Sequence, residues 1–100
     1  MDKILGMLGM AKRAGKVTSG SFLCEKAIRQ KDAQLIVIAR DAADNAKQDM
    51  IHLCKRFGVS YIEYAEKTAL GNSIGAGERA VVAINDQNFA QALLAKYSKN

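Results

Sequence analysis

The chain has 100 residues, of which 49% are hydrophobic and 25% are charged. This length suits one domain over residues 1–100, and folding should bury roughly two-thirds of the extended chain's surface without a disulfide framework or a structural metal. The formal net charge is +5, and residues 1–31 hold all of that excess, with seven bases and two acids. Such an asymmetry indicates a polyanionic partner.

Several protein classes are excluded by pattern. No apolar run approaches the roughly 20 residues that span a bilayer, and the apolar segment 4–11 lacks the flanks and cleavage pattern of a secretory signal. We therefore expect a cytoplasmic protein without a membrane partner. Cys24 and Cys54 are 30 positions apart, which matches neither a zinc motif nor a disulfide framework, so we expect two buried thiols.

The hydrophobic period changes repeatedly along the first half of the chain. Asp2 is expected to cap a first helix that Gly15 ends. Residues 16–19 are predicted to be a short extended piece, and a second helix is predicted from Gly20 and Ser21 to about residue 30. The continuous β-branched run 35–39 is typical of a strand buried on both faces.

In the second half, Asp44 is expected to cap a third helix that Gly58 ends. A strand over 59–64 and a short helix over about 66–72 follow, and then a glycine-bearing loop over 71–77. A second buried strand covers 80–84, and Asp86 is expected to cap the last helix. Strands that alternate with helices predict a three-layer α/β/α sandwich with a small mixed four-stranded sheet.

The second predicted helix has an unusual polar face. At 100° per residue, Lys26 and Arg29 fall within roughly 40° of Phe22. The opposite face, which is expected to be the core face, holds Leu23, Cys24, Ala27 and Ile28. An exposed aromatic beside two cations, next to Lys16 and the free N–H groups of a turn at Gly20, is suited to bind phosphates and stack a base. The alternative is a phenylalanine at the edge of the core with solvated cations around it.

The loop over 71–77 matches neither the dinucleotide-binding glycine pattern nor the P-loop, and a strand follows it. It offers mobility, with Ile74 and Ala76 at its tip and Arg79 beyond. An apolar side chain exposed on such a loop can cover an unstacked base. The alternative is an ordinary tight connection into the last strand.

Candidates for catalysis are few. His52 is the only histidine, and it falls on the polar face of the third predicted helix. Capping and turn formation explain Asp41 and Asp44 better than a magnesium site does. We therefore expect no enzyme, no metal and no cofactor.

Six segments resemble, in their order and spacing, the ribosomal protein L7Ae/L30e superfamily, and most closely its bacterial YlxQ-like branch. They are GKVTSG at 15–20, KAIR at 26–29, LIVIARDA at 35–42, YIE at 61–63, LGNSIG at 70–75 and RAVVAI at 79–84. The resemblance covers essentially the whole chain. It implies an α/β/α sandwich that recognises kink-turn RNA, in which sheared G·A pairs lie beside a sharply bent bulge.

The resemblance also shows a departure. In the RNA-binding members, a Gly-x-Asn-Glu-x-x-Lys signature opens the second helix, and the loop before the last strand covers an extruded base. Gly20 and Lys26 match the glycine and lysine, whereas Phe22 and Leu23 take the Asn and Glu positions. Because neither side chain can hydrogen-bond a guanine edge, we expect weaker kink-turn discrimination and a larger share for phosphate contacts and stacking.

The sequence therefore predicts a monomeric, non-enzymatic RNA-binding protein of ribosomal type. Its expected partner is kink-turn or similarly structured RNA, ribosomal or otherwise related to translation, with the ribosome as a further candidate. The predicted RNA-binding residues are Arg13, Lys16, Gly20, Ser21, Phe22, Lys26, Arg29, Ile74, Gly75, Ala76 and Arg79. The alternative is a ribosome-associated adaptor that has lost kink-turn recognition and docks a protein on Phe22 and Leu23.

Overall fold

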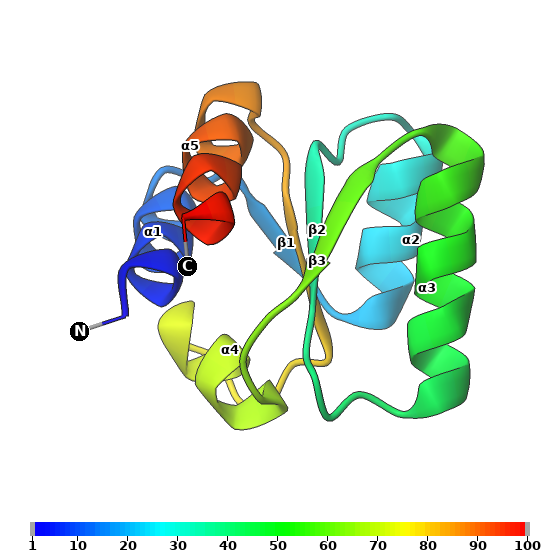
Figure 1. Cartoon of the computed structure of the whole chain (residues 1–100), viewed down its shortest axis with the longest axis horizontal. Helices are drawn as coiled ribbons and strands as arrows, with labels where there is room; N and C mark the ends of the chain where they lie inside the picture. Colours follow the sequence, from blue (N-terminus) through cyan, green and yellow to red (C-terminus); the bar gives the residue numbers. More distant parts are fainter. Residues whose placement is uncertain (1, 100) are drawn as a thin grey trace.

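The computed structural model describes residues 2–99, and its elements form three layers (Figure 1). They run in the order α1 (Lys3–Arg13), β1 (Val17–Ser19), α2 (Ser21–Arg29), β2 (Leu35–Ile38), α3 (Asp44–Phe57), β3 (Ser60–Glu63), α4 (Lys67–Ser73), β4 (Val81–Ile84) and α5 (Gln87–Ser98). One face of the sheet packs on α1, α4 and α5, and the other on α2 and α3. The predicted α/β/α sandwich is confirmed.

Aspartate side chains cap the N-termini of two helices, α1 and α5. The Asp2 carboxylate accepts a hydrogen bond from the Leu5 N–H at 2.9 Å and caps α1, and Asp86 caps α5 through the Phe89 N–H. The predicted cap at Asp44 is wrong. Ala43 is the N-cap of α3 and no side chain caps it, while Asp44 lies in the first turn, where its charge complements the helix dipole.

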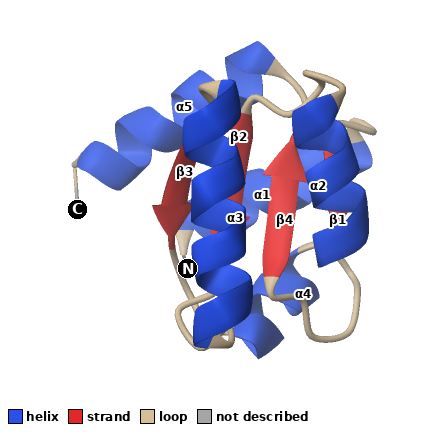
Figure 2. Ribbon diagram, turned by 90° about the vertical axis from the view of Figure 1, so that its right-hand side faces the viewer, coloured by secondary structure: helices blue, strands red, loops and turns tan. Residues whose placement is uncertain are grey.

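The sheet has four strands in the order β1-β4-β2-β3, in which β2 and β3 are parallel and β4 is antiparallel to both of its neighbours. The ends of β1, β2 and β3 therefore meet the start of β4 at one edge. The helix α2 also begins there, and we call this the α2 edge (Figure 2).

The core lies on both faces of the sheet because β2 and β4 are buried along their whole length. Alternate strand residues, such as Val37 and Val82, pack toward α1, α4 and α5. Their neighbours Ile36 and Ala83 pack toward α2 and α3. Within residues 2–99, no helix is long and apolar enough to cross a bilayer.

Candidate nucleic-acid interface

The first turn of α2 carries unpaired donors. Gly20 is the N-cap with φ 93°, a left-handed conformation that favours glycine, and its own N–H donates to the Val81 carbonyl at 3.0 Å. Within residues 2–99 no side chain caps the helix, and its first internal bond runs from the Cys24 N–H to the Gly20 carbonyl. The N–H groups of residues 21–23 therefore face outward at the positive end of the helix dipole, which favours anions.

The outer face of α2 matches the predicted arrangement. Phe22 is 76% exposed, and Lys26 and Arg29 are exposed on the same face. The expectation that Leu23 belongs to the core is wrong, since it is 51% exposed. Its direction lies roughly 90° from the centre of the buried face, which Cys24, Ala27 and Ile28 fill without it.

The loop between α4 and β4 differs from its prediction at Ile74. That side chain is only 6% exposed and packs in the core under α1 and α5, so its expected exposure at the loop tip is wrong. The physical reason is that α4 runs to Ser73, and a hydrogen bond from the Ile74 N–H to the Gly71 carbonyl turns Ile74 inward. Ala76 is half-buried against the same core, and Gly75 is exposed.

The same loop folds tightly over α4. The Ala76 N–H donates to the Gly71 carbonyl at 2.9 Å. A Cβ placed on Gly71 would lie 1.8 Å from the Gly77 carbonyl oxygen, so only glycine fits there. This geometry favours the second alternative from the sequence, an ordinary tight connection into the last strand, over a mobile loop.

Arg79 links the loop to the start of α2. Its Nε donates to the Ser19 hydroxyl at 3.2 Å, and its Nη1 donates to the Glu78 carbonyl at 2.9 Å. Ser19 immediately precedes Gly20, so the loop and the first turn of α2 lie on one edge of the molecule (Figures 1 and 2).

Two predicted residues lie elsewhere. Arg13 ends α1, on the opposite face of the sheet from α2 (Figure 1). Lys16 precedes β1, and its carbonyl accepts from the Asn85 N–H at the far end of β4. Four residues of extended chain, about 13 Å, separate Lys16 from Gly20. The structure therefore does not bring Arg13 and Lys16 to the outer face of α2.

Arg40 is a cation on the α2 edge that the sequence prediction missed. It is exposed directly after β2, and its guanidinium lies 5.2 Å from the ring centroid of Tyr64. Its one signal in the sequence is its position after a buried strand. Only the antiparallel pairing of β2 with β4 places that position beside the α4–β4 loop.

The cysteines are buried, and Asp41 is hydrogen-bonded to the backbone, so these candidates for catalysis have structural roles. Burial raises the pKa of Cys24 to about 12 and that of Cys54 to about 11, so both thiols stay protonated at neutral pH. The Asp41 carboxylate accepts from the Lys67 N–H at 2.8 Å and caps α4. His52 is exposed, and the described residues contain no group of three side chains placed to hold a metal ion.

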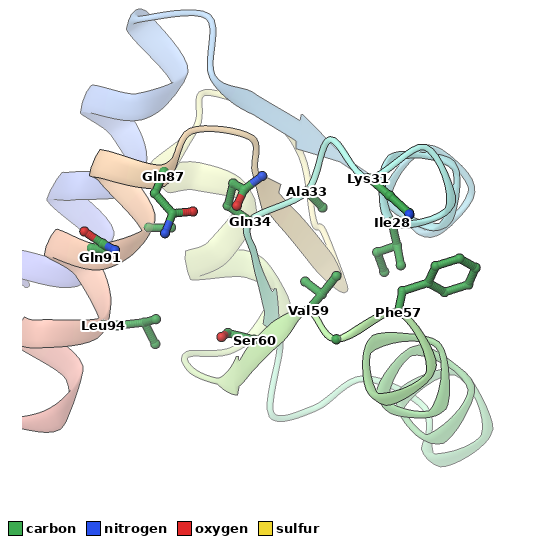
Figure 3. Close-up of a pocket in the computed structure, with 12 residues that line it drawn as sticks. Ile28, Lys31, Ala33, Gln34, Phe57, Val59, Ser60, Gln87, Gln91 and Leu94 are labelled. Carbon is green, nitrogen blue, oxygen red and sulfur yellow. The ribbon is translucent and has the colours of Figure 1, made fainter.

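A cleft of about 560 Å³ lies at the other end of the sheet, where β2 and β3 begin (Figure 3). Its labelled lining includes Lys31, Gln34 and Ser60, together with Gln87 and Gln91 of α5. None of the predicted RNA-binding residues lines it. The candidate site is therefore an open surface at the α2 edge, which suits a macromolecule better than a small ligand.

Residues 2–94 match the Ribosomal protein L7Ae/L30e/S12e/Gadd45 family. The chain belongs to this family. It is 40% identical over 88 residues to the RNA-binding protein YlxQ of Bacillus subtilis strain 168, covering 88% of each chain. It is also 31% identical over 97 residues to the large ribosomal subunit protein eL8 of Cenarchaeum symbiosum strain A, covering 94% of this chain and 75% of that protein.

Solved structures show the same fold. A protein of unknown function from Bacillus halodurans C superimposes with a TM-score of 0.92 at 27% identity, over 95% of this chain and 96% of the other. The 15.5 kD RNA-binding protein of Giardia lamblia superimposes with a TM-score of 0.80 at 20% identity, over 99% and 91%. The second likeness supports the architecture alone.

Proposed function

We propose that this protein is a non-catalytic, cytoplasmic RNA-binding protein of ribosomal type that recognises kink-turn or similarly bent RNA. Relatives named as RNA-binding and ribosomal proteins support the general class. The observation that carries the proposal is Phe22, 76% exposed beside the unpaired N–H groups of the first turn of α2. An exposed aromatic ring beside free N–H donors and two cations offers both stacking and phosphate contacts to a nucleic-acid partner.

The chemistry of the surface suggests how RNA is bound. A phosphate accepts from the N–H groups of residues 21–23, and Lys26 and Arg29 add charge along the same helix face. Phe22 offers a ring on which an unpaired base stacks. Gly75 and Ala76 flank this surface, and Arg79 holds the loop in place through Ser19. Because Phe22 and Leu23 cannot read base edges, charge and stacking carry most of the affinity.

A mobility-shift experiment tests the kink-turn part of the proposal. One RNA carries an intact kink turn, and the other has its G·A pairs replaced by Watson–Crick pairs. We expect the intact kink turn to bind about tenfold more tightly, which corresponds to one discriminating contact or less. Equal, weak binding to both RNAs would refute kink-turn recognition and leave general RNA binding standing.

Phe22→Ala tests the stacking role. We expect RNA binding to weaken about tenfold or more, because stacking on one aromatic contributes about 1–3 kcal/mol. The urea midpoint should stay unchanged because the ring is 76% exposed. Met10→Ala is the matched control, since Met10 is 51% exposed on the other side of the sheet. A large loss of stability in Phe22→Ala would instead assign the ring to the core.

A protein-docking adaptor is the second candidate, and the exposure of Leu23 favours it. Phe22 and Leu23 together form an exposed apolar pair at the α2 edge. A leucine side chain can neither hydrogen-bond RNA nor offer a ring for stacking. Leu23→Ser separates the two functions. RNA affinity that survives this change supports the RNA site, whereas an absence of RNA binding in the unmodified protein supports the adaptor.

A further inference from the structure

A second surface lies on the opposite side of the sheet from α2. It is an open groove of about 1120 Å³ between α1 and α4, which Lys96 of α5 also lines. Its apolar lining comes from Leu5, Met7 and Met10 of α1 and from Ala69 of α4. Met10 is 51% exposed, one of three large apolar side chains with that much exposure among the described residues. The proposed RNA site uses none of these residues.

Two glycines of α1, Gly6 and Gly9, line this groove. A Cβ on Gly9 would lie 2.9 Å from the Ser73 carbonyl oxygen, so the packing of α1 on α4 requires glycine there. Among residues 2–99, a Cβ on Gly6 would meet nothing within 4 Å, yet Gly6 lies inside a helix, where glycine is unfavourable. The fold therefore gives no reason for Gly6, whereas a partner that approaches the α1 backbone closely does.

The rim of the groove is cationic. Lys3 and Arg13 lie at opposite ends of α1, ten residues or about 15 Å apart along the helix axis, and Lys96 adds a third charge. Within residues 2–99, none of these cations lies within ion-pair distance of a carboxylate. The one acid on the rim, Asp2, already accepts from the Leu5 N–H and the Tyr64 hydroxyl. The groove is thus apolar at its centre, and its rim carries three cations and one carboxylate, with Lys3 beside Asp2 at one end of α1 and Arg13 at the other.

We propose that this groove docks an acidic amphipathic helix of a partner protein. About three turns of helix match the 15 Å between Lys3 and Arg13. Leucine-like side chains at helical spacing contact Met10 and the bare backbone at Gly6, and carboxylates at the helix ends meet the rim cations. An RNA occupant fits less well because none of the described residues that line the groove is aromatic, and a second copy fits less well because each chain carries a net charge of +5.

The test uses a designed helical peptide with leucines at helical spacing and glutamates elsewhere, labelled for fluorescence anisotropy. The control peptide keeps the leucines and replaces every glutamate with lysine. We expect saturable micromolar binding of the acidic peptide alone, with amide shifts in the ¹⁵N spectrum of the full chain confined to residues 3–13 and 69–73. Those shifts locate the peptide without any mutation.

Variants then test the contacts. Met10→Ser, and separately the pair Lys3→Glu and Arg13→Glu, should each weaken the acidic peptide about tenfold. Lys55 on α3 and Phe22 on α2 are exposed outside the groove, so the control variants Lys55→Glu and Phe22→Ser should leave the affinity for the acidic peptide unchanged. The proposal is overturned if the acidic peptide does not saturate, if the lysine peptide binds equally, or if the shifts fall on α2. Shifts of the groove amides caused by kink-turn RNA or by self-association on concentration would also overturn it.

Discussion

Gly71 and Gly6 show how differently two glycines can serve one fold. A Cβ at Gly71 would lie 1.8 Å from the Gly77 carbonyl oxygen, which belongs to backbone and cannot rotate away. A Cβ at Gly6 would meet no atom of the described part of the chain within 4 Å. The first glycine is therefore required by the turn into β4, and the second is not required by the folded chain itself.

The same substitution at these two positions should have opposite effects. We expect Gly71→Ala to lower the free energy of unfolding by about 1–3 kcal/mol, the typical cost of forcing extra volume into a packed site. Gly6→Ala should raise it by about 0.5–1 kcal/mol, because alanine is the better helix former. Urea denaturation of both variants measures the difference. A stable Gly71→Ala protein would show that the loop can move off α4.

At the scale of an element, the α4–β4 connection is held by its own core contact. Ile74 is 6% exposed and packs with residues of α1, α4 and α5, whereas Leu23 in α2 is 51% exposed. The two aliphatic side chains are of similar size. Their different burial makes them a matched pair for separating core from surface.

We expect Ile74→Ala to cost about 2–5 kcal/mol of stability, because it removes buried methylenes and leaves a cavity. Leu23→Ala should stay within about 0.5 kcal/mol of the unmodified protein. Urea denaturation of both variants measures their free energies of unfolding, and equal m-values make the two values comparable. Near-equal losses in the two variants would mean that Leu23 is covered in solution.

The cations on the outer face of α2 should make RNA affinity depend on salt concentration. Lys26 is exposed beside Phe22, so a phosphate bound there releases one counterion per lysine contact. Lys26→Ala should reduce the slope of log affinity against log salt by about one unit, while Lys55→Ala on α3 leaves the slope unchanged. An unaltered slope in Lys26→Ala would remove this lysine from the interface.

At the scale of the whole molecule, four of the seven bases in residues 1–31 lie on two separate surfaces. Lys26 and Arg29 lie on α2, and Lys3 and Arg13 lie on α1, on the opposite face of the sheet (Figure 1). A single stretch of basic sequence thus supplies two separate cationic sites. One is suited to RNA, and the other, by our further proposal, to an acidic helix.

A side-chain hydrogen bond between Asp2 and Tyr64, which are far apart in the sequence, links α1 to the sheet. The Tyr64 hydroxyl donates to the Asp2 carboxylate at 2.5 Å and ties the start of α1 to the end of β3. Partial burial raises the pKa of Asp2, but the hydrogen bonds from Tyr64 and from the Leu5 and Ile4 N–H groups outweigh it, and the net pKa is lowered. The same hydrogen bond to Asp2 raises the pKa of Tyr64.

The two shifts define a pH window for stability. The contribution of Asp2 is present above its unfolded pKa of 3.8 and is lost as pH falls through the lower folded value. The contribution of Tyr64 is present below its unfolded pKa of 10.0 and is lost as pH rises through the higher folded value. We expect Tyr64→Phe to lower the Tm between these limits and to match the unmodified protein more closely outside them.

Thermal melts across the pH range measure this difference. Tyr97→Phe is the control, since Tyr97 touches Tyr64 edge to face but no hydrogen bond of its hydroxyl is seen within residues 2–99. A Tm difference for Tyr64→Phe that is the same at every pH would mean that the hydroxyl contributes packing and not a hydrogen bond to a charged group.

Local sequence determined the elements of this protein and the face of one helix. Aspartates before apolar helical patterns capped α1 and α5, and the β-branched runs became buried strands. The grouping of Phe22 with Lys26 and Arg29 followed from helix geometry alone, since all three lie within one element. Such features depend on residues a few positions apart, so a sequence pattern predicts them.

The tertiary structure decided how these elements were placed. The strand order β1-β4-β2-β3 brought Arg40 to the α2 edge, and the packing of α1 on the opposite face of the sheet from α2 put Arg13 in the other layer. The turn that follows Ser73, the last residue of α4, buried Ile74 and left Gly75 exposed. These outcomes rest on pairings between residues far apart in the chain, and such pairings leave no local period in the sequence. The positive charge of residues 1–31 can therefore be counted in the sequence, but only the packing of the layers separates Lys26 and Arg29 on α2 from Lys3 and Arg13 on α1.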